Sequence, residues 1–365
     1  MVIKMDNEEL RAVKEDINNG SDNNEYESRA KKVFSRFGFA YLYAEFANTI
    51  FGSLIMGLLI KLVWIRKENV NVNANLLVSL GTLYILGFLP AFFLIRKIPK
   101  TDITKKSIGI GKWSAAVCIV YAVSMLCNIL GIILNSLMGA ITGIGVVNPI
   151  SEVLNGMNPA ILICFVAIIG PIVEELMFRK LLVDRICQYG EGITIFVSGM
   201  MFGLFHGNFA QFFYAFFIGV LLAYIYMRTG KIKYTIGIHI FINTMSSLLM
   251  IAMQQIDIYA ISSYLDSGDR ESYMNYIMQN MPVFAMLGLI VMFLGAITLI
   301  GTILCIVFRK KFYIKSNSGE IAKGSRLKTV LINPGMMIFV IYFITIIGLT
   351  QCGISLSSIL SNLIL

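Results

Sequence analysis

Long apolar stretches alternate with short polar segments along almost the whole chain. Apolar runs long enough to cross a bilayer, about 20 residues each, lie at 41–65, 76–95, 113–144, 159–188, 192–206, 209–227, 234–253, 283–308 and 329–349. Glycine, proline and serine inside these runs are compatible with transmembrane helices, whereas the strands of a membrane barrel read as short alternating segments. The pattern predicts an all-α fold, a polytopic transmembrane helical bundle of eight or nine spans.

Composition supports a membrane protein. Of the 365 residues, 57% are hydrophobic and 14% are charged, and the mean hydropathy is +0.77, which lies outside the range of ordinary globular domains. The six cysteines lie in or beside apolar runs without paired spacing, which argues against a disulfide framework or a CxxC metal site. We therefore expect an integral multi-pass membrane protein.

The distribution of Lys and Arg predicts the orientation. Five polar segments carry many basic residues: 29–36 has four, 96–112 six, 179–185 three, 228–233 three and 309–328 seven. The alternate segments carry few: 66–75 has two, 145–158 none and 254–282 one. This alternation predicts a cytoplasmic N-terminus in a plasma membrane. The net charge of +9 reflects the basic residues of the cytoplasmic segments. We therefore expect contact with anionic membrane lipids and not with nucleic acid.

Few ionisable residues fall inside the apolar runs, and such residues are functional-site candidates because burying charge in a bilayer is costly. Glu174, Glu175 and Arg179 lie in the fourth run, His206 ends the fifth, and His239 lies in the seventh. The chain has two histidines, and both are in this set.

Helical spacing places the two adjacent glutamates on different faces of their helix. Glu175 and Arg179 are four residues apart and share one helix face, whereas Glu174 is turned about 100° away. A buried arginine needs a carboxylate partner in any protein, so we expect Glu175 and Arg179 to form a structural ion pair. Glu174 has no basic partner three or four residues away on its own helix, which favours a functional role.

The other candidates also lie in pairs four residues apart. Phe202 precedes His206 by one turn, and His239 precedes Asn243 by one turn, so each pair shares a helix face. At about 1.5 Å per residue, Glu174, His206 and Asn243 lie roughly 18–22 Å from the cytoplasmic ends of their helices, provided that the fourth helix continues to Gln188. The three helices can then bring these groups to one level. Taken alone, an isolated histidine or asparagine is more often a contact between helices, and Phe202 is a packing residue.

The motifs "EELMFR", "FGLFH" and "HIFIN" resemble the EExxxR, FxxxH and HxxxN/D motifs of the CPBP (Abi) family. This family includes the type II CAAX prenyl endopeptidases and bacterial proteins linked to bacteriocin immunity and peptide processing. The resemblance covers about 159–250, with the three motifs in the family's order on successive membrane segments.

The resemblance implies intramembrane hydrolysis of a peptide bond in a hydrophobic or lipidated peptide or protein. It implies that Glu174 activates a water with help from His206, and that His239 and Asn243 stabilise the oxyanion. Glu175 and Arg179 would hold the site together, with Phe202 as a further supporting residue. Water must reach such a site, so we expect a polar cavity open to the cytoplasmic side.

The metal requirement has two readings. Glu174, His206 and His239 would supply the three ligands of a catalytic zinc ion, and the resemblance is compatible with a metalloprotease or a glutamate protease. The sequence contains no HExxH, and we favour a glutamate mechanism without a cofactor, with zinc as the alternative.

Two classes of non-enzymatic membrane protein are alternatives to a peptidase. A non-catalytic immunity or scaffold protein would bind a bacteriocin-like peptide or a membrane partner and use the polar cluster only for packing. A transporter would use the same residues to carry protons or an ion, but the hydropathy shows no inverted repeat. A serine mechanism has no GxSxG motif to support it.

The chain divides into four predicted parts. A cytoplasmic N-terminal tail, expected to be partly disordered, occupies 1–40, and N-terminal transmembrane helices follow over 41–158. The catalytic transmembrane core with the three motifs covers 159–253, and C-terminal transmembrane helices cover 254–365. The tail mixes acids and bases and lacks the apolar region of a signal peptide.

Overall fold

The computed structural model describes residues 20–63, 72–143, 156–316 and 319–354. Within this part of the chain, eight helices are long and apolar enough to cross a membrane: Asn24–Leu59, Val72–Ile95, Ile110–Ile141, Pro159–Tyr189, Phe209–Thr229, Ile232–Met253, Met281–Lys311 and Pro334–Gln351. The predicted span at 192–206 is the helix Glu191–Phe205, whose 15 residues fall short of the 20 or so that a bilayer requires. The protein is a polytopic helical bundle, as the sequence predicts.

The described residues form the following elements. The first group is α2 (Gly20–Val63), α3 (Val72–Gly81), the π-helical segment η2 (Thr82–Phe88), α4 (Leu89–Ile95) and α5 (Ile110–Thr142). The second is α7 (Pro159–Ile161), π-helical η3 (Leu162–Ile169), α8 (Gly170–Glu175), π-helical η4 (Leu176–Leu181), α9 (Val183–Ile186), the 3-10 turn η5 (Cys187–Tyr189), α10 (Glu191–Phe205), α11 (Phe209–Thr229) and α12 (Ile232–Met253). The third is α13 (Ile258–Ser267), α14 (Arg270–Gln279), α15 (Met281–Phe308), η6 (Arg309–Lys311), η7 (Lys323–Ser325), α16 (Arg326–Val330) and α17 (Pro334–Gln351).

The first helix begins well before the predicted boundary at residue 40. Helix α2 is continuous over 44 residues, a length of about 66 Å. Ala30, Phe34 and Phe37 are fully buried, and their spacing of three and four residues places them on one apolar face. Residues 26–40 therefore pack against the bundle and differ from the partly disordered tail that the sequence suggests, whereas residues 1–19 of that tail lie outside the described residues.

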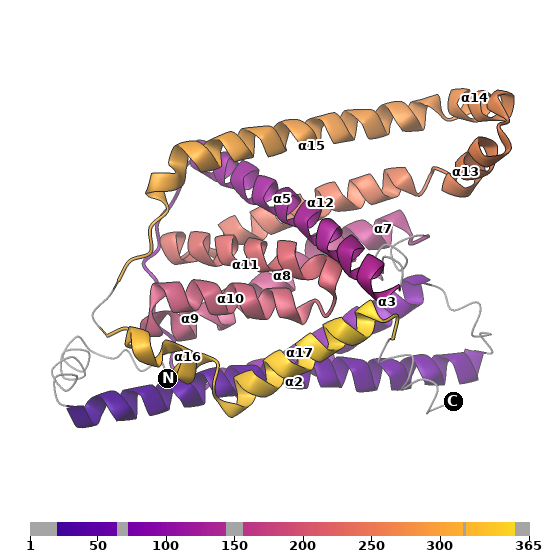
Figure 1. Ribbon diagram of the computed structural model, residues 1–365. Coiled ribbons are helices and arrows are strands. Elements are labelled where there is room, and N and C mark those ends of the chain that lie inside the picture. The colour runs from indigo at the N-terminus through magenta and orange to yellow at the C-terminus, as the bar shows by residue number, and fades with distance from the viewer. Residues whose placement is uncertain (1–19, 64–71, 144–155, 317–318, 355–365) are drawn as a thin grey trace.

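The segment 254–282, which reads as a loop in the sequence, contains two helices. Asp257 precedes α13 and its side chain accepts a hydrogen bond from the backbone N–H of Ala260, while Asp269 caps α14 in the same way through Ser272. N-terminal aspartate caps of this kind stabilise short helices. The pair lies beyond the ends of α12 and α15, at the right of Figure 1.

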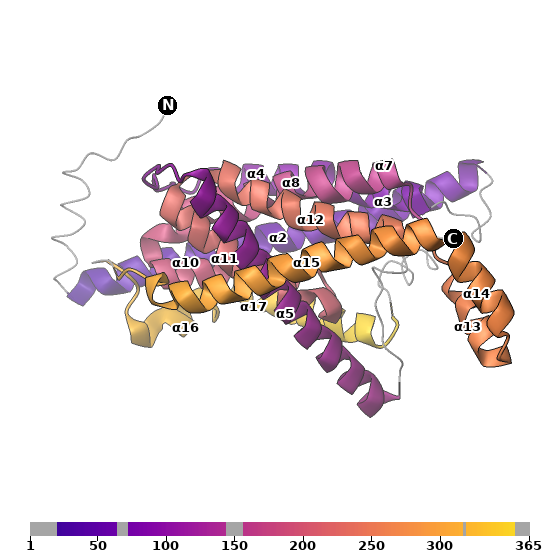
Figure 2. The same cartoon turned by 90° about the horizontal axis from the view of Figure 1, so that it is seen from above.

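The long helices pack at crossing angles around the central elements α8 to α12. Figure 1 shows α17 running beside α2 along the lower edge, α15 along the upper edge, and α5 running diagonally from the α15 side toward α3. Figure 2 shows the same helices from above, where α5 and α15 cross. Helices α2 and α17 meet at two glycines, Gly38 and Gly335, and a Cβ atom on Gly335 would overlap the carbonyl oxygen of Ser35.

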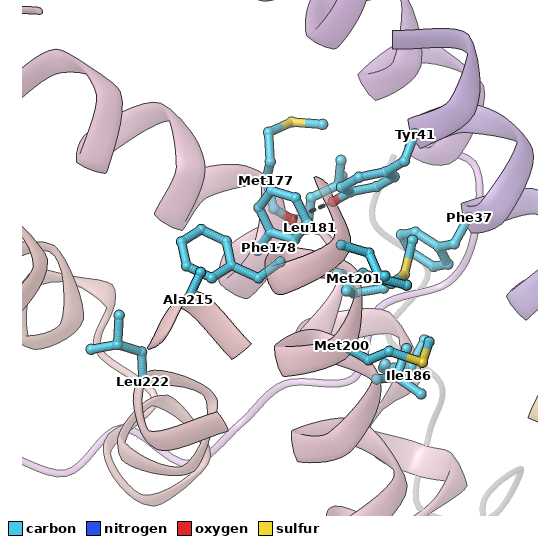
Figure 3. Close-up of a cluster of buried hydrophobic side chains, with 14 of the residues drawn as sticks. Phe37, Tyr41, Met177, Phe178, Leu181, Ile186, Met200, Met201, Ala215 and Leu222 are labelled. Carbon is cyan, nitrogen blue, oxygen red and sulfur yellow. Dashed lines mark hydrogen bonds between the residues drawn. The ribbon is translucent and has the colours of Figure 1, made fainter. Parts of the chain in front are cut away.

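The buried core lies between α2, the fourth span and α10 (Figure 3). The ring of Phe178 lies 5.0 Å from that of Tyr41 on α2 and 5.2 Å from that of Phe202 on α10, both in edge-on geometry. Edge-on aromatic pairs add about 0.5–1.5 kcal/mol each beyond the area that they bury. The core therefore fixes the position of α10 and of its terminal histidine relative to the fourth span.

Candidate active site

The fourth span carries the two glutamates on an irregular helix. The α-helical segment α8 lies between the π-helical segments η3 and η4. The backbone N–H of Gly170 donates to the carbonyl of Phe165 in a π-helical bond, and Pro171 at the start of α8 has no N–H to donate. π-helical turns occur often at functional sites. The helical span continues to Tyr189, which meets the condition set above for bringing the polar groups to one level.

Three neighbouring helices donate side-chain hydrogen bonds to the carbonyls of these π-helical segments. The bonds run from Tyr41 of α2 to Met177 (2.8 Å), from Ser198 of α10 to Phe178 (3.0 Å) and from Asn243 of α12 to Val166 (3.0 Å). Hydrogen bonds between helices are a principal source of specific contact inside a bilayer. They hold the fourth span against the helices that carry the other candidate residues.

Glu175 and Arg179 form a fully buried ion pair. The distance from Arg179 Nη1 to Glu175 Oε1 is 3.2 Å, and both side chains are 0% exposed. The guanidinium also lies 4.5 Å from the ring centroid of Phe202, and the Thr235 hydroxyl lies beside the Glu175 carboxylate. A desolvated cation over an aromatic face contributes about 2 kcal/mol. The pair predicted from spacing is present, and Phe202 supports it through this contact.

His239 contacts both glutamates. Its Nδ1 atom lies 3.1 Å from Oε1 of Glu175 and its Nε2 atom lies 3.6 Å from Oε2 of Glu174. A carboxylate paired with an arginine accepts hydrogen bonds, so Nδ1 carries the proton that it donates to Glu175. The 3.6 Å distance between Nε2 and Oε2 of Glu174 is longer than a direct hydrogen bond.

Accessibility distinguishes the adjacent carboxylates. The Glu174 side chain is 28% exposed, whereas that of Glu175 is 0% exposed. Glu175 already has Arg179 and His239 as partners. Only Glu174 of the two is therefore placed to meet a water or a substrate.

His206 is held in one orientation at the end of α10. Its Nδ1 atom donates to the carbonyl oxygen of Phe202 at 2.8 Å, so in the neutral ring Nε2 is a hydrogen-bond acceptor. The imidazole is close enough to Glu174 to interact with its charge. Gly207, with φ of +64°, lets the chain turn immediately after this residue, and Asn208 Nδ2 donates to the His206 carbonyl at 2.9 Å.

Phe202 brings the two histidines together. Its ring centroid lies 4.9 Å from that of His206 and 5.6 Å from that of His239, in edge-on geometry. Asn243 lies one turn beyond His239, and its amide donates to Val166 of the fourth span. The predicted residues therefore converge from three segments, with Asn243 placed against the backbone of η3.

The sequence reading missed several polar neighbours of this cluster. Tyr84 of η2 and Tyr214 of α11 both interact with the charge of Glu174, and no motif points to either. Thr235 beside Glu175 was detectable, because it lies four residues before His239 and shares its helix face.

Outside this cluster, Glu45 is a further intramembrane carboxylate in α2, which accepts a hydrogen bond from Thr49 at 3.3 Å.

Within the described part of the chain, the side chains that could bind a metal ion do not converge on one point. Among the residues that the structure describes, no group of three or more His, Cys, Asp and Glu side chains is arranged to hold a metal ion. Glu174, His206 and His239, the three candidate zinc ligands, are neighbours but do not form such a group. No step in the chemistry below is assigned to a metal.

Comparison with known proteins adds one match. Residues 156–245 match the family model described as Type II CAAX prenyl endopeptidase Rce1-like. No curated protein and no solved structure matches the chain. The matched residues include all three sequence motifs and every candidate residue assigned above from the sequence.

Proposed function

We propose that this protein hydrolyses a peptide bond through a water activated by Glu174, because residues 156–245 match the model of the type II CAAX prenyl endopeptidases. The observation that carries the proposal is the position of His239 between the two carboxylates, with Glu175 paired to Arg179 and Glu174 accessible. The match supports an intramembrane peptidase of CAAX type; the glutamate mechanism and the substrate below are our proposals.

In the first step, Glu174 accepts a proton from a water whose oxygen attacks the carbonyl carbon of the substrate. The Nε2 lone pair of His206 accepts the second water hydrogen and orients the nucleophile, because its Nδ1 proton is held by Phe202. General-base assistance of this kind contributes typically 10²–10⁴-fold. The carbonyl oxygen becomes the oxyanion of a tetrahedral intermediate.

In the second step, donors on α12 stabilise the negative oxygen. His239 stabilises the oxyanion through its Nε2 side, while Glu175 holds the ring at Nδ1. Asn243 has a second amide hydrogen besides the one that it gives to Val166. Such preorganised donors lower the barrier most where water is excluded.

The intermediate then collapses. The carbon–nitrogen bond breaks, the amide nitrogen takes the proton that Glu174 accepted, and the products are a carboxylic acid and an amine. The carboxylate of Glu174 is thereby regenerated. The chemistry is balanced with water as the single co-reactant.

The proposed substrate is a hydrophobic or lipidated peptide or protein. The two glutamates and His239 lie on spans that are long enough to cross a bilayer, so a substrate that partitions into the membrane reaches the site at high local concentration. The matched family name refers to prenylated proteins ending in CAAX, and prenylated peptides are therefore one class to test.

The experiment compares cleavage of fluorogenic hydrophobic and prenylated peptides by the detergent-purified full chain. Wild type is compared with Glu174→Gln, and the matched control is Glu45→Gln, which removes another intramembrane carboxylate outside the cluster. We expect cleavage by wild type and the control, and a fall of roughly a hundredfold or more for Glu174→Gln. Equal cleavage by Glu174→Gln and wild type at equal thermal stability would reject the mechanism.

A further inference from the structure

A second feature of the protein, away from the glutamate cluster, is a cavity of about 810 Å³ on the first helix. It lies between the early part of α2, the end of α4 at Leu94, and the start of α17 at 332–334. None of the residues assigned to catalysis lines it. Its volume is in the range of cavities that hold small-molecule ligands.

The cavity is lined by three cations and no acid. Lys31, Lys32 and Arg36 face it from successive turns of α2. None of the three forms a salt bridge with a residue that the structure describes. Lys32 and Arg36 are exposed. Three cations without a neutralising carboxylate in one cavity favour an anionic ligand.

The polarity of the lining changes along the helix. After the three cations, the next lining residues on α2 are the exposed aromatic side chains Phe39 and Tyr43. Tyr43 lies about 16 Å further along the axis than Lys32. The cavity is thus cationic at one end and apolar at the other, which matches a molecule with an anionic head and a hydrocarbon tail.

Two chain segments place the cationic end at the membrane surface. On α2 no charge follows Arg36 until Glu45. Helix α4 ends at Ile95 and is followed at once by Arg96 and Lys97. Basic pockets between transmembrane helices at the surface bind the head groups of anionic lipids.

The start of α17 forms a fixed wall of the cavity. The hydroxyl of Ser35 accepts a hydrogen bond from the backbone N–H of Gly335 at 2.9 Å. The side-chain oxygen of Asn333 accepts one from the backbone N–H of Met336. These N–H groups are therefore already bonded within the protein. A bound anion would be held by the α2 side chains and not by the helix N-terminus.

We propose that this cavity binds an anionic phospholipid, with its phosphate between Lys31, Lys32 and Arg36 and its first acyl carbons against Phe39, Tyr43 and Leu94. The lipid lies outside the peptidase site, and the proposal does not depend on the proposed reaction. It assigns a defined lipid site to one of the basic segments of the chain.

The test is native mass spectrometry of the purified full chain titrated with phosphatidylglycerol or with phosphatidylcholine of the same acyl chains. The variant Lys31→Gln/Lys32→Gln/Arg36→Gln removes the cations. The matched control Lys310→Gln/Lys311→Gln/Lys315→Gln removes the same charge from another basic segment. We expect wild type and the control to prefer phosphatidylglycerol, and the cavity variant to lose on the order of a hundredfold in affinity.

Two further arms make the result decisive. If the triple variant does not fold, Lys32→Gln/Arg36→Gln carries the same test, because both side chains are exposed. Inorganic phosphate in excess is expected not to displace the lipid. Equal binding of the two lipids, equal loss in both glutamine triples, or displacement by inorganic phosphate each overturns the proposal.

Discussion

The imidazole of His239 lies between Glu174 and Glu175, 3.6 Å from the first carboxylate and 3.1 Å from the second. Adjacent residues on a helix point about 100° apart, so a ring placed between the two directions reaches both. One carboxylate is neutralised by Arg179, and the other is accessible. The ring of His239 therefore links the buried Glu175–Arg179 pair with the group proposed to activate water.

The first prediction concerns His239. Replacing it by alanine removes the donor to the oxyanion but leaves Glu175 paired with Arg179, so we expect membrane accumulation close to wild type and a fall in cleavage of roughly a hundredfold or more. The control is Ser246→Ala on the exposed face of the same helix. Peptide cleavage per mole of purified protein is the measurement, and undiminished cleavage by His239→Ala contradicts the assignment.

The second prediction concerns the buried ion pair. Arg179→Met leaves the Glu175 charge without its arginine, and removing one member of a buried pair costs about 3–5 kcal/mol. The double variant Glu175→Gln/Arg179→Met removes both charges and should be more stable than the single variant. Thermal unfolding in detergent measures both. Equal loss of stability in the two variants would show that the pair contributes little.

The third prediction concerns the contact between α2 and α17. Gly335→Ala introduces a methyl group that overlaps the Ser35 carbonyl oxygen, so the helices must separate. We expect a loss of about 1–3 kcal/mol, as for other overpacked sites. Gly348→Ala on the same helix is the control, because a Cβ atom there meets nothing within 4 Å. The two unfolding midpoints are compared, and identical values argue against this packing.

The fourth prediction concerns metal. We expect the purified protein to contain less than one equivalent of zinc and to keep its cleavage rate after treatment with a chelator. Elemental analysis and the peptide assay, run on the same sample before and after dialysis, give the answer. Stoichiometric zinc that is lost together with activity, and restored with it, would establish the alternative zinc mechanism through Glu174, His206 and His239.

Contacts within one helix were predictable from the sequence. The Glu175–Arg179 pair follows from a spacing of four residues and requires no knowledge of the neighbouring helices. The helical bundle follows from the lengths of the apolar runs. The sequence predicted a shared level only for Glu174, His206 and Asn243. That His239 meets Glu174 while Asn243 bonds Val166 was not predictable, because the rotation and axial position of α12 decide which side chains meet.

Other features gave no usable sequence signal. The helical state of residues 20–36 was missed because their many charges hide the apolar face formed by Ala30 and Phe34. Tyr84 was missed because nothing in a single apolar run indicates which aromatic ring faces a distant carboxylate. The π-helical segments η3 and η4 were missed as well, since the same residue types form ordinary α-helix elsewhere in the chain.

The π-helical segments determine which helices can stand beside the fourth span. Inside a bilayer, apolar contacts alone give little preference for one neighbouring helix over another, because lipid tails are as apolar as the helix surfaces. The hydroxyls of Tyr41 and Ser198 each match one carbonyl of η4, so only a helix with a donor at that level completes the contact. The irregular turn beside the glutamates thus also binds α2 and α10, so one stretch of backbone serves both the candidate site and the packing of the bundle.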